Sequence, residues 1–80
     1  MSKSIFTPNQ EKLLVLLRQI RKEAGLSQFD LAQRLNQSQS FISKYEHGER
    51  RLDLLELRQV CEAVDITLQE FVQRFEDLLK

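Results

Sequence analysis

The chain has 80 residues, of which 41% are apolar and 30% are charged, and it contains two glycines, one proline and one cysteine. This length fits one small domain, and the composition argues against intrinsic disorder and favours helices over hairpins. A single cysteine cannot form an internal disulfide, and no apolar run approaches the roughly 20 residues that span a bilayer. We therefore expect a single all-α domain over residues 1–80 that is cytoplasmic, with no cofactor, metal or membrane partner.

The net charge is zero, but the charges are unevenly distributed along the chain. Residues 1–52 carry nine Lys or Arg and five acidic residues, a net charge of +4, whereas residues 53–80 carry three and seven, a net charge of −4. A basic part with an acidic end is compatible with an oriented approach to a polyanion. It is equally compatible with solvated helix surfaces whose charges sort by chance.

Start and stop signals predict five helices in chain order. Gly25, Asn36 and Gly48 are expected to end the first three, because each of these residue types tolerates a positive φ. The fourth helix is expected to bury one face, formed by Leu54, Leu57, Cys61 and Val64. The fifth, at about 68–79, is strongly amphipathic. Each helix follows a residue whose side chain can cap it: Thr7, Ser27, Ser38, Asp53 and Thr67.

Residues 28–47 are typical of two short helices joined by a tight turn. Apolar residues at positions 4, 8, 15 and 18 of this segment have the spacing that pins two such helices near perpendicular: Leu31, Leu35, Ile42 and Tyr45. This is the helix-turn-helix geometry, in which the second helix enters the DNA major groove.

The same region resembles the Cro/repressor-type (Xre-like) helix-turn-helix family from about Leu17 to Ile66. Asn36 stands where the family usually has a glycine, and Gln37 where it usually has an apolar residue. The resemblance implies a compact five-helix, lambda-repressor-like DNA-binding domain that regulates transcription, as a repressor. It is carried by Leu26-Ser27-Gln28, Leu31-Ala32, Ser38-Gln39-Ser40, Ile42-Ser43, Glu46 and Gly48-Glu49-Arg50.

The polar residues of the predicted recognition helix are the candidate base contacts. Gln39 and Ser40 lie in its first turn, and Ser43 and Lys44 lie one turn further on. A glutamine amide can bond to adenine through two hydrogen bonds, a serine hydroxyl can serve several bases, and Lys44 can reach guanine or a phosphate. A merely solvated polar face is the alternative.

Other residues are candidates for phosphate contacts or for support. The resemblance implies that Gln28 binds a phosphate, helped by the positive end of its helix. His47 and Arg50, after the recognition helix, are further candidate phosphate contacts, with a solvated loop as the alternative. By the same resemblance, Arg21 pairs with Glu46 as a structural ion pair that aligns the recognition helix.

The fifth helix offers more apolar surface than a small core uses. One domain of this kind reads only about half a site, and a two-fold dimer would read half-sites about 34 Å apart. We therefore expect a homodimer on double-stranded DNA. The alternative is that this helix only closes its own domain. The candidate interface residues are Phe71, Phe75, Leu78 and Leu79.

No pattern in the chain predicts catalysis or a small-molecule ligand. His47 has no nucleophile at motif spacing, and Cys61 lies on an apolar helix face, as an inert buried thiol does. The sequence has no phosphate-binding glycine loop and no metal-ligand pair on a helix. The rival to a DNA-binding regulator is a protein-interaction module, antitoxin-like or a regulatory subunit, that docks through its C-terminal helix.

Overall fold

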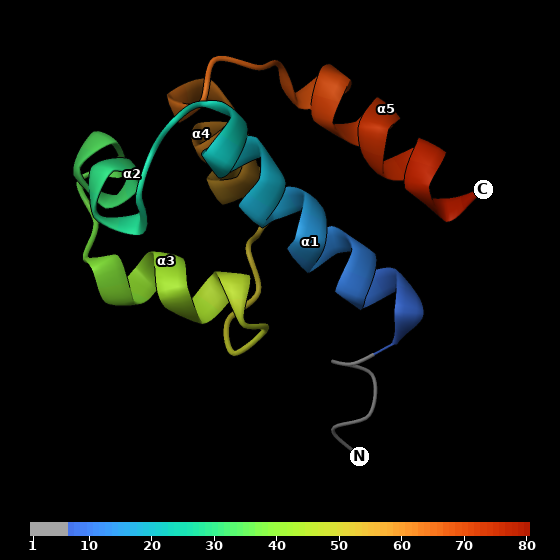
Figure 1. Ribbon diagram of the computed structural model, residues 1–80, viewed down its shortest axis with the longest axis horizontal. Helices are drawn as coiled ribbons and strands as arrows, with labels where there is room; N and C mark the ends of the chain where they lie inside the picture. Colours follow the sequence, from blue (N-terminus) through green and yellow to red (C-terminus); the bar gives the residue numbers. More distant parts are fainter. Residues whose placement is uncertain (1–6) are drawn as a thin grey trace.

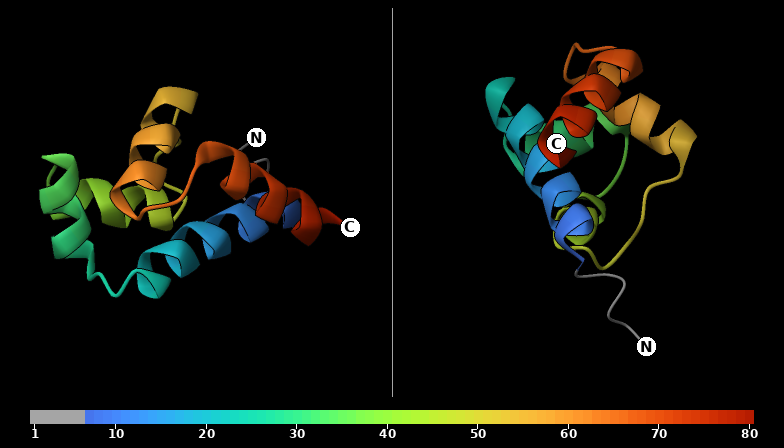
Figure 2. Two further views of the ribbon diagram at one scale, coloured as in Figure 1. Left: turned by 90° about the horizontal axis from the view of Figure 1, so that it is seen from above. Right: turned by 90° about the vertical axis from the view of Figure 1, so that its right-hand side faces the viewer.

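The computed structural model describes residues 7–80, and these residues form five helices packed around one core. The first six residues of the predicted domain lie outside the described range. α5 lies alongside α1, and α2 packs against α3 at the other end of the molecule (Figures 1 and 2). Residues 7–80 contain no strand, so the predicted all-α, five-helix fold is confirmed. The helices are α1 (Pro8–Glu23), α2 (Gln28–Leu35), α3 (Gln39–Glu46), α4 (Leu54–Ala63) and α5 (Leu68–Leu79).

The helix boundaries follow from the predicted caps. At each N-terminus the cap side chain accepts a hydrogen bond from the backbone N–H three residues later, at 2.7–3.2 Å. Gly25, Asn36 and Gly48 adopt the predicted positive φ, with values of 75°, 56° and 81°. Asp65 does the same after α4 at 65°, which the sequence analysis did not predict.

The turn between α2 and α3 is closed by the backbone alone. The N–H of Asn36 donates to the carbonyl of Gln33 at 3.1 Å, and that of Gln37 donates to the carbonyl of Ala32 at 2.9 Å. The left-handed conformation of Asn36 makes this possible without a glycine. The side chain of Gln37 is exposed, so its polarity does not disturb the core.

Every helix contributes at least one buried apolar residue to the core. Burial of a large apolar side chain contributes about 1.5–3 kcal/mol, so these few contacts supply most of the stability of so small a domain. One sequence prediction is wrong: Leu54 is 65% exposed, because it occupies the first position of α4, beyond the stripe that faces the core. The buried apolar residues are Leu16, Leu17, Ile20, Leu31, Ala32, Ile42, Tyr45, Val60, Cys61, Val64 and Phe71.

α5 uses part of its apolar face inside its own domain. Phe71 is only 2% exposed, so its assignment to a dimer interface is wrong: the core already surrounds the ring. Phe75 and Leu79 are half-buried, and Leu78 is 39% exposed. A bidentate ion pair connects α5 to the end of α1: Nη1 and Nη2 of Arg74 donate to Oε1 and Oε2 of Glu23, at 3.0 and 2.9 Å.

The described residues contain neither a membrane-spanning helix nor a metal-binding cluster. No helix among residues 7–80 is long and apolar enough to cross a membrane. Within the same range, no group of three or more His, Cys, Asp or Glu side chains is placed to hold a metal ion.

Candidate nucleic-acid interface

α3 presents a polar face to solvent. Ser38 caps it, and its opposite side is fixed in the core by Ile42 and Tyr45, which are at most 1% exposed. Those two residues set the rotation of the helix, so Gln39, Ser40 and Lys44 point outward, whereas Glu46 lies on the buried side. Among the predicted base contacts, three are exposed and the Ser43 side chain is half-buried; the four are Gln39, Ser40, Ser43 and Lys44.

A buried ion pair ties α3 to α1. The Nε of Arg21 donates to Oε2 of Glu46 at 2.7 Å, and its Nη2 donates to Oε1 at 3.0 Å. Glu46 is 1% exposed and Arg21 is 8% exposed. The hydrogen bond with Glu46 raises the pKa of Arg21, so the guanidinium stays charged. Nη1 of Arg21 also donates to the carbonyl of Leu26 at 3.0 Å, so this residue fixes the start of α2 as well.

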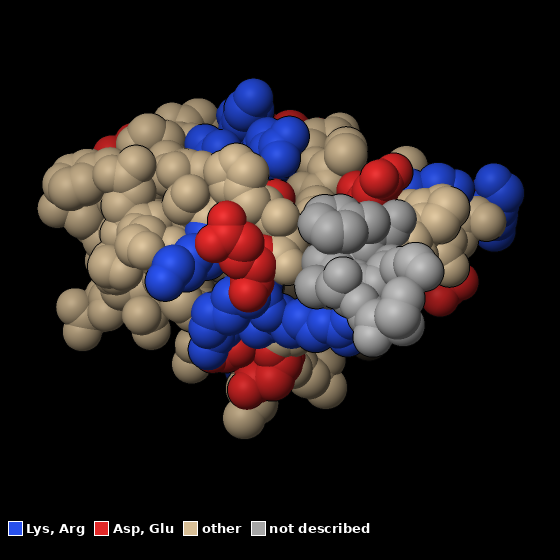
Figure 3. Space-filling view, turned by 90° about the horizontal axis from the view of Figure 1, so that it is seen from below, with Lys and Arg blue, Asp and Glu red and all other residues tan. Residues whose placement is uncertain are grey.

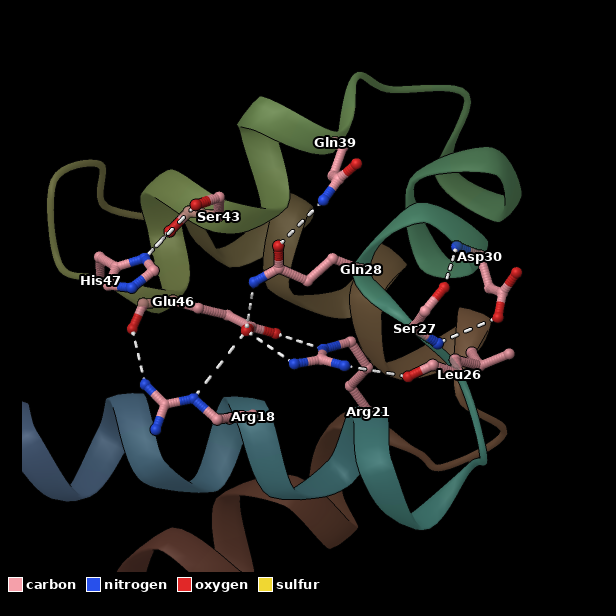
Figure 4. A network of polar contacts seen from close by, with 10 residues as sticks. All are labelled: Arg18, Arg21, Leu26, Ser27, Gln28, Asp30, Gln39, Ser43, Glu46 and His47. Carbon is pink, nitrogen blue, oxygen red and sulfur yellow. Dashed lines mark hydrogen bonds and ion pairs between the residues drawn. The ribbon is translucent and has the colours of Figure 1, made fainter.

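The side-chain amide of Gln28 lies between this ion pair and Gln39, in the first turn of α3 (Figure 4). Its Nε2 donates to Oε1 of Glu46 at 3.1 Å, and its Oε1 accepts from Nε2 of Gln39 at 3.4 Å. Sequence reasoning assigned Gln28 to a phosphate and did not foresee either contact. Arg18 was also missed: its Nη2 lies 3.5 Å from the carbonyl oxygen of Glu46. The sequence did contain a sign of this contact: Arg18 stands three residues before Arg21, so both side chains lie on the same face of α1.

The loop after α3 carries the other predicted phosphate contacts. His47 is exposed, and its Nδ1 lies 2.7 Å from the carbonyl oxygen of Ser43, so the hydrogen sits on Nδ1 when that contact forms. The guanidinium of Arg50 donates to both carboxylate oxygens of Glu56, at 3.0 and 2.8 Å, and lies 4.7 Å from the centre of the Phe41 ring.

The charge of Arg50 is therefore matched within the domain. The hydrogen bonds from Arg50, together with the one that the backbone N–H of Asp53 donates to Oε1 of Glu56 at 2.9 Å, lower the pKa of Glu56 to about 2. A phosphate role for Arg50 stays a prediction. The neighbouring Arg51 is exposed and has no ion pair with any residue of the described part. The sequence alone cannot show that one of these two consecutive arginines is paired and the other is not.

The charges on this side of the molecule are localised (Figure 3). Figure 3 views the molecule from below in Figure 1, the side on which α3 lies. Lys and Arg side chains gather near the middle of this face, bordered by acidic groups, whereas the part toward α2 and the N-terminal end of α3 carries almost no charge. The neutral end bears the amide and hydroxyl groups that could distinguish bases, and the basic part suits a phosphate backbone.

Comparisons with known proteins agree with this geometry. A family model described as Helix-turn-helix matches residues 17–71. The structure is similar to an XRE-family like protein from Pseudomonas syringae pv. tomato str. DC3000, with a TM-score of 0.84 and 35% identity over 99% of this chain and 96% of that one.

Two other similar structures have named roles. One is the restriction-modification controller protein C.Esp1396I, a tetramer in complex with its natural 35-base-pair operator, with a TM-score of 0.79 and 25% identity over 92% of this chain and 99% of that one. The other is the clp gene regulator ClgR from C. glutamicum, with a TM-score of 0.76 and 22% identity over 89% and 91%, which supports the fold alone. No curated protein matches the chain.

Proposed function

The chain belongs to the Xre-like helix-turn-helix family of DNA-binding transcription regulators, and we propose that it is a repressor that occupies an operator through α3. The observation that carries this proposal is the exposed row of amide, hydroxyl and ammonium groups on a helix whose other side is locked in the core. Repression then follows from occupancy, because a bound domain excludes other proteins from the same stretch of duplex.

Base readout is assigned to the exposed side of α3. Gln39 and Ser40 lie at the N-terminal end, which approaches the base edges in a helix-turn-helix complex. The Gln39 amide matches the N6 and N7 positions of adenine, and Ser40 and Ser43 each contribute a hydroxyl. Lys44, one turn further on, reaches guanine or a phosphate.

Phosphate contacts position the domain and contribute affinity on any sequence. Gln28 retains one amide hydrogen that neither Glu46 nor Gln39 uses, and that hydrogen is available to a phosphate at the N-terminus of α2. His47 and Arg51 serve the following phosphates from the loop after α3. Arg50 joins them only if the duplex displaces Glu56 from its guanidinium.

A homodimer would double these contacts. α5 exposes Val72 and Leu78, and Phe75 and Leu79 are half-buried beside the core, so this helix remains the proposed interface without Phe71. The similar controller protein C.Esp1396I is a tetramer in complex with its operator. This similarity supports the proposal that the present chain also assembles on DNA. Leu54 and Leu55 form a second exposed apolar pair, at the start of α4, which is the alternative interface.

Selection of bound duplexes from a random pool, at a stated salt concentration, tests the function. The wild-type chain is expected to enrich one sequence, and Gln39→Ala is expected to weaken binding to it by about 1–3 kcal/mol and to relax one base-pair position. Gln69→Ala is the matched control, because Gln69 is an exposed glutamine in the first turn of α5. Absence of any enriched sequence, or co-purification of a stoichiometric protein partner without DNA affinity, would overturn the proposal in favour of a protein-interaction module.

A further inference from the structure

A pocket of about 180 Å³ lies between α1, α3 and the loop of residues 47–53 that leads into α4. α1 and α4 diverge toward this loop, so helix packing does not close the space between them (Figure 2). The lining residues lie far apart in sequence, and for this reason no single motif indicated a small-molecule site. The apolar wall is formed by Leu13, Leu14 and Leu17 of α1, Tyr45 of α3, Leu52 of the loop and Leu57 of α4.

The apolar wall is large enough to hold the body of a small molecule away from water. Leu17 and Tyr45 are at most 3% exposed, whereas Leu13 and Leu52 are half-buried, so the wall runs from the core toward the surface. A protein cavity of roughly 150 Å³ that is lined by apolar side chains accommodates one benzene molecule. A pocket of about 180 Å³ with this lining therefore fits an apolar group of the size of a benzene ring.

The polar part of the lining is basic. It consists of Gln10, Arg50 and Arg51, and none of the pocket-lining residues in the described part of the chain is acidic. Glu56 already matches the charge of Arg50, whereas Arg51 is exposed and has no ion pair within residues 7–80. A guanidinium holds a carboxylate through two parallel hydrogen bonds, so the free charge of Arg51 complements an acidic ligand.

We propose that this pocket binds a small carboxylic acid whose apolar part is about the size of a benzene ring. The ring lies among the leucines, and the carboxylate pairs with Arg51 at the rim. A neutral aromatic molecule would leave the guanidinium unused, and a small anion would leave the apolar wall exposed to water. Only a molecule with both parts matches the whole lining.

The same site gives a means of controlling DNA binding, and this consequence rests on the proposed function. Arg51 is also a proposed phosphate contact, and a guanidinium that is paired with a bound carboxylate no longer neutralises that phosphate. Loss of one phosphate contact weakens binding on all sequences alike and lowers the steepness of log K against log salt by about 0.9. The bound acid therefore favours release of the duplex, and the duplex lowers the affinity for the acid by the same factor.

Phenylacetate is the probe, with 2-phenylethanol as its uncharged counterpart and acetate as the charge without the ring. In an NMR titration of the isotope-labelled chain without DNA, phenylacetate should give saturable shifts of the backbone amide signals of residues 10–17 and 50–57. The other two compounds should bind at least about tenfold more weakly. Shifts that do not saturate, or equal affinities for phenylacetate and 2-phenylethanol, would overturn the inference.

Two substitutions separate the charge from the apolar space. Arg51→Gln changes an exposed residue, so the domain should stay folded, and phenylacetate should bind about tenfold more weakly while 2-phenylethanol is unaffected. Leu52→Phe fills part of the pocket and should weaken the binding of both compounds. The control is Arg58→Gln, because Arg58 is an exposed arginine of α4 that does not line the pocket. A folded Arg51→Gln variant with the wild-type affinity for phenylacetate would contradict the assignment.

The effect on DNA is measured with the duplex that the wild-type chain enriches, at constant ionic strength with acetate as the reference salt. Saturating phenylacetate should weaken DNA binding of the wild type about fivefold and leave that of Arg51→Gln unchanged. Unchanged DNA affinity of the phenylacetate-bound wild type would refute the control of DNA binding. A chain that selects no duplex would overturn the proposed function, whereas the NMR titration decides independently whether the pocket binds the acid.

Discussion

Replacing Arg21 with Met should strongly destabilise the domain. The change removes the cation but leaves the Glu46 carboxylate 1% exposed, with the Gln28 amide and the more distant Arg18 as its remaining partners. Removing one member of a buried ion pair typically costs 3–5 kcal/mol. A domain of 80 residues has a total stability of roughly 4–12 kcal/mol. The melting temperature of Arg21→Met should therefore fall by at least about 12 °C.

The double variant Arg21→Met with Glu46→Leu identifies the cause. If the cost arises from an unpaired buried charge, removing the carboxylate as well should restore most of the lost stability, because apolar pairs often replace buried ion pairs at little cost. Urea unfolding of the wild type, both single variants and the double variant gives the coupling between the two sites. The reasoning fails if the double variant is as unstable as the sum of the single ones, because the pair would then act through packing and not through charge.

Three further predictions concern other parts of the domain. Tyr45→Phe should leave stability unchanged or raise it by up to about 1 kcal/mol, because the buried Tyr45 hydroxyl has no hydrogen-bond partner among residues 7–80; a clear loss in urea unfolding would contradict this. The contact of Glu56 with Arg50 lowers the pKa of Glu56 from 4.5 to about 2, so its stabilisation is complete above about pH 4.5 and disappears as the pH falls toward 2. The stability difference between wild type and Glu56→Gln should therefore shrink over that range, and a difference that is constant with pH would refute the assignment. Leu78→Lys should give a folded monomer by sedimentation, whereas a dimer that persists in Leu78→Lys and dissociates in Leu54→Lys would place the interface at α4.

The local structure of this chain is strongly encoded in its sequence. The five cap residues, the glycine ends and the left-handed Asn36 were all predictable, because each depends only on hydrogen bonds and sterics within a few residues. The Arg21–Glu46 contact is of a different kind, since 25 residues separate its members. Only the family resemblance suggested it before the structure placed the two side chains 2.7 Å apart.

The predictions that failed depend on how much surface each helix buries. The helical periodicity predicted the apolar face of α5 correctly, but it does not show that Phe71 is buried in the core whereas Leu78 remains exposed. The same limit applies to Leu54, which continues an apolar stripe in sequence but stands at the first position of α4. A helical repeat describes one element, whereas burial depends on where the neighbouring helices end.

The position of Gln28 shows that a side chain can make contacts that its place in the sequence does not predict. A polar residue at the first position of α2 fits a phosphate contact, and that assignment needs only one amide hydrogen. In the structure the other hydrogen is donated to Glu46 and the oxygen accepts from Gln39, so one side chain joins the buried ion pair, the N-terminal end of α2 and the first turn of α3. Under the proposed function, neutral amide and hydroxyl groups of this kind supply the discrimination between DNA sequences, because phosphate contacts contribute affinity on any sequence.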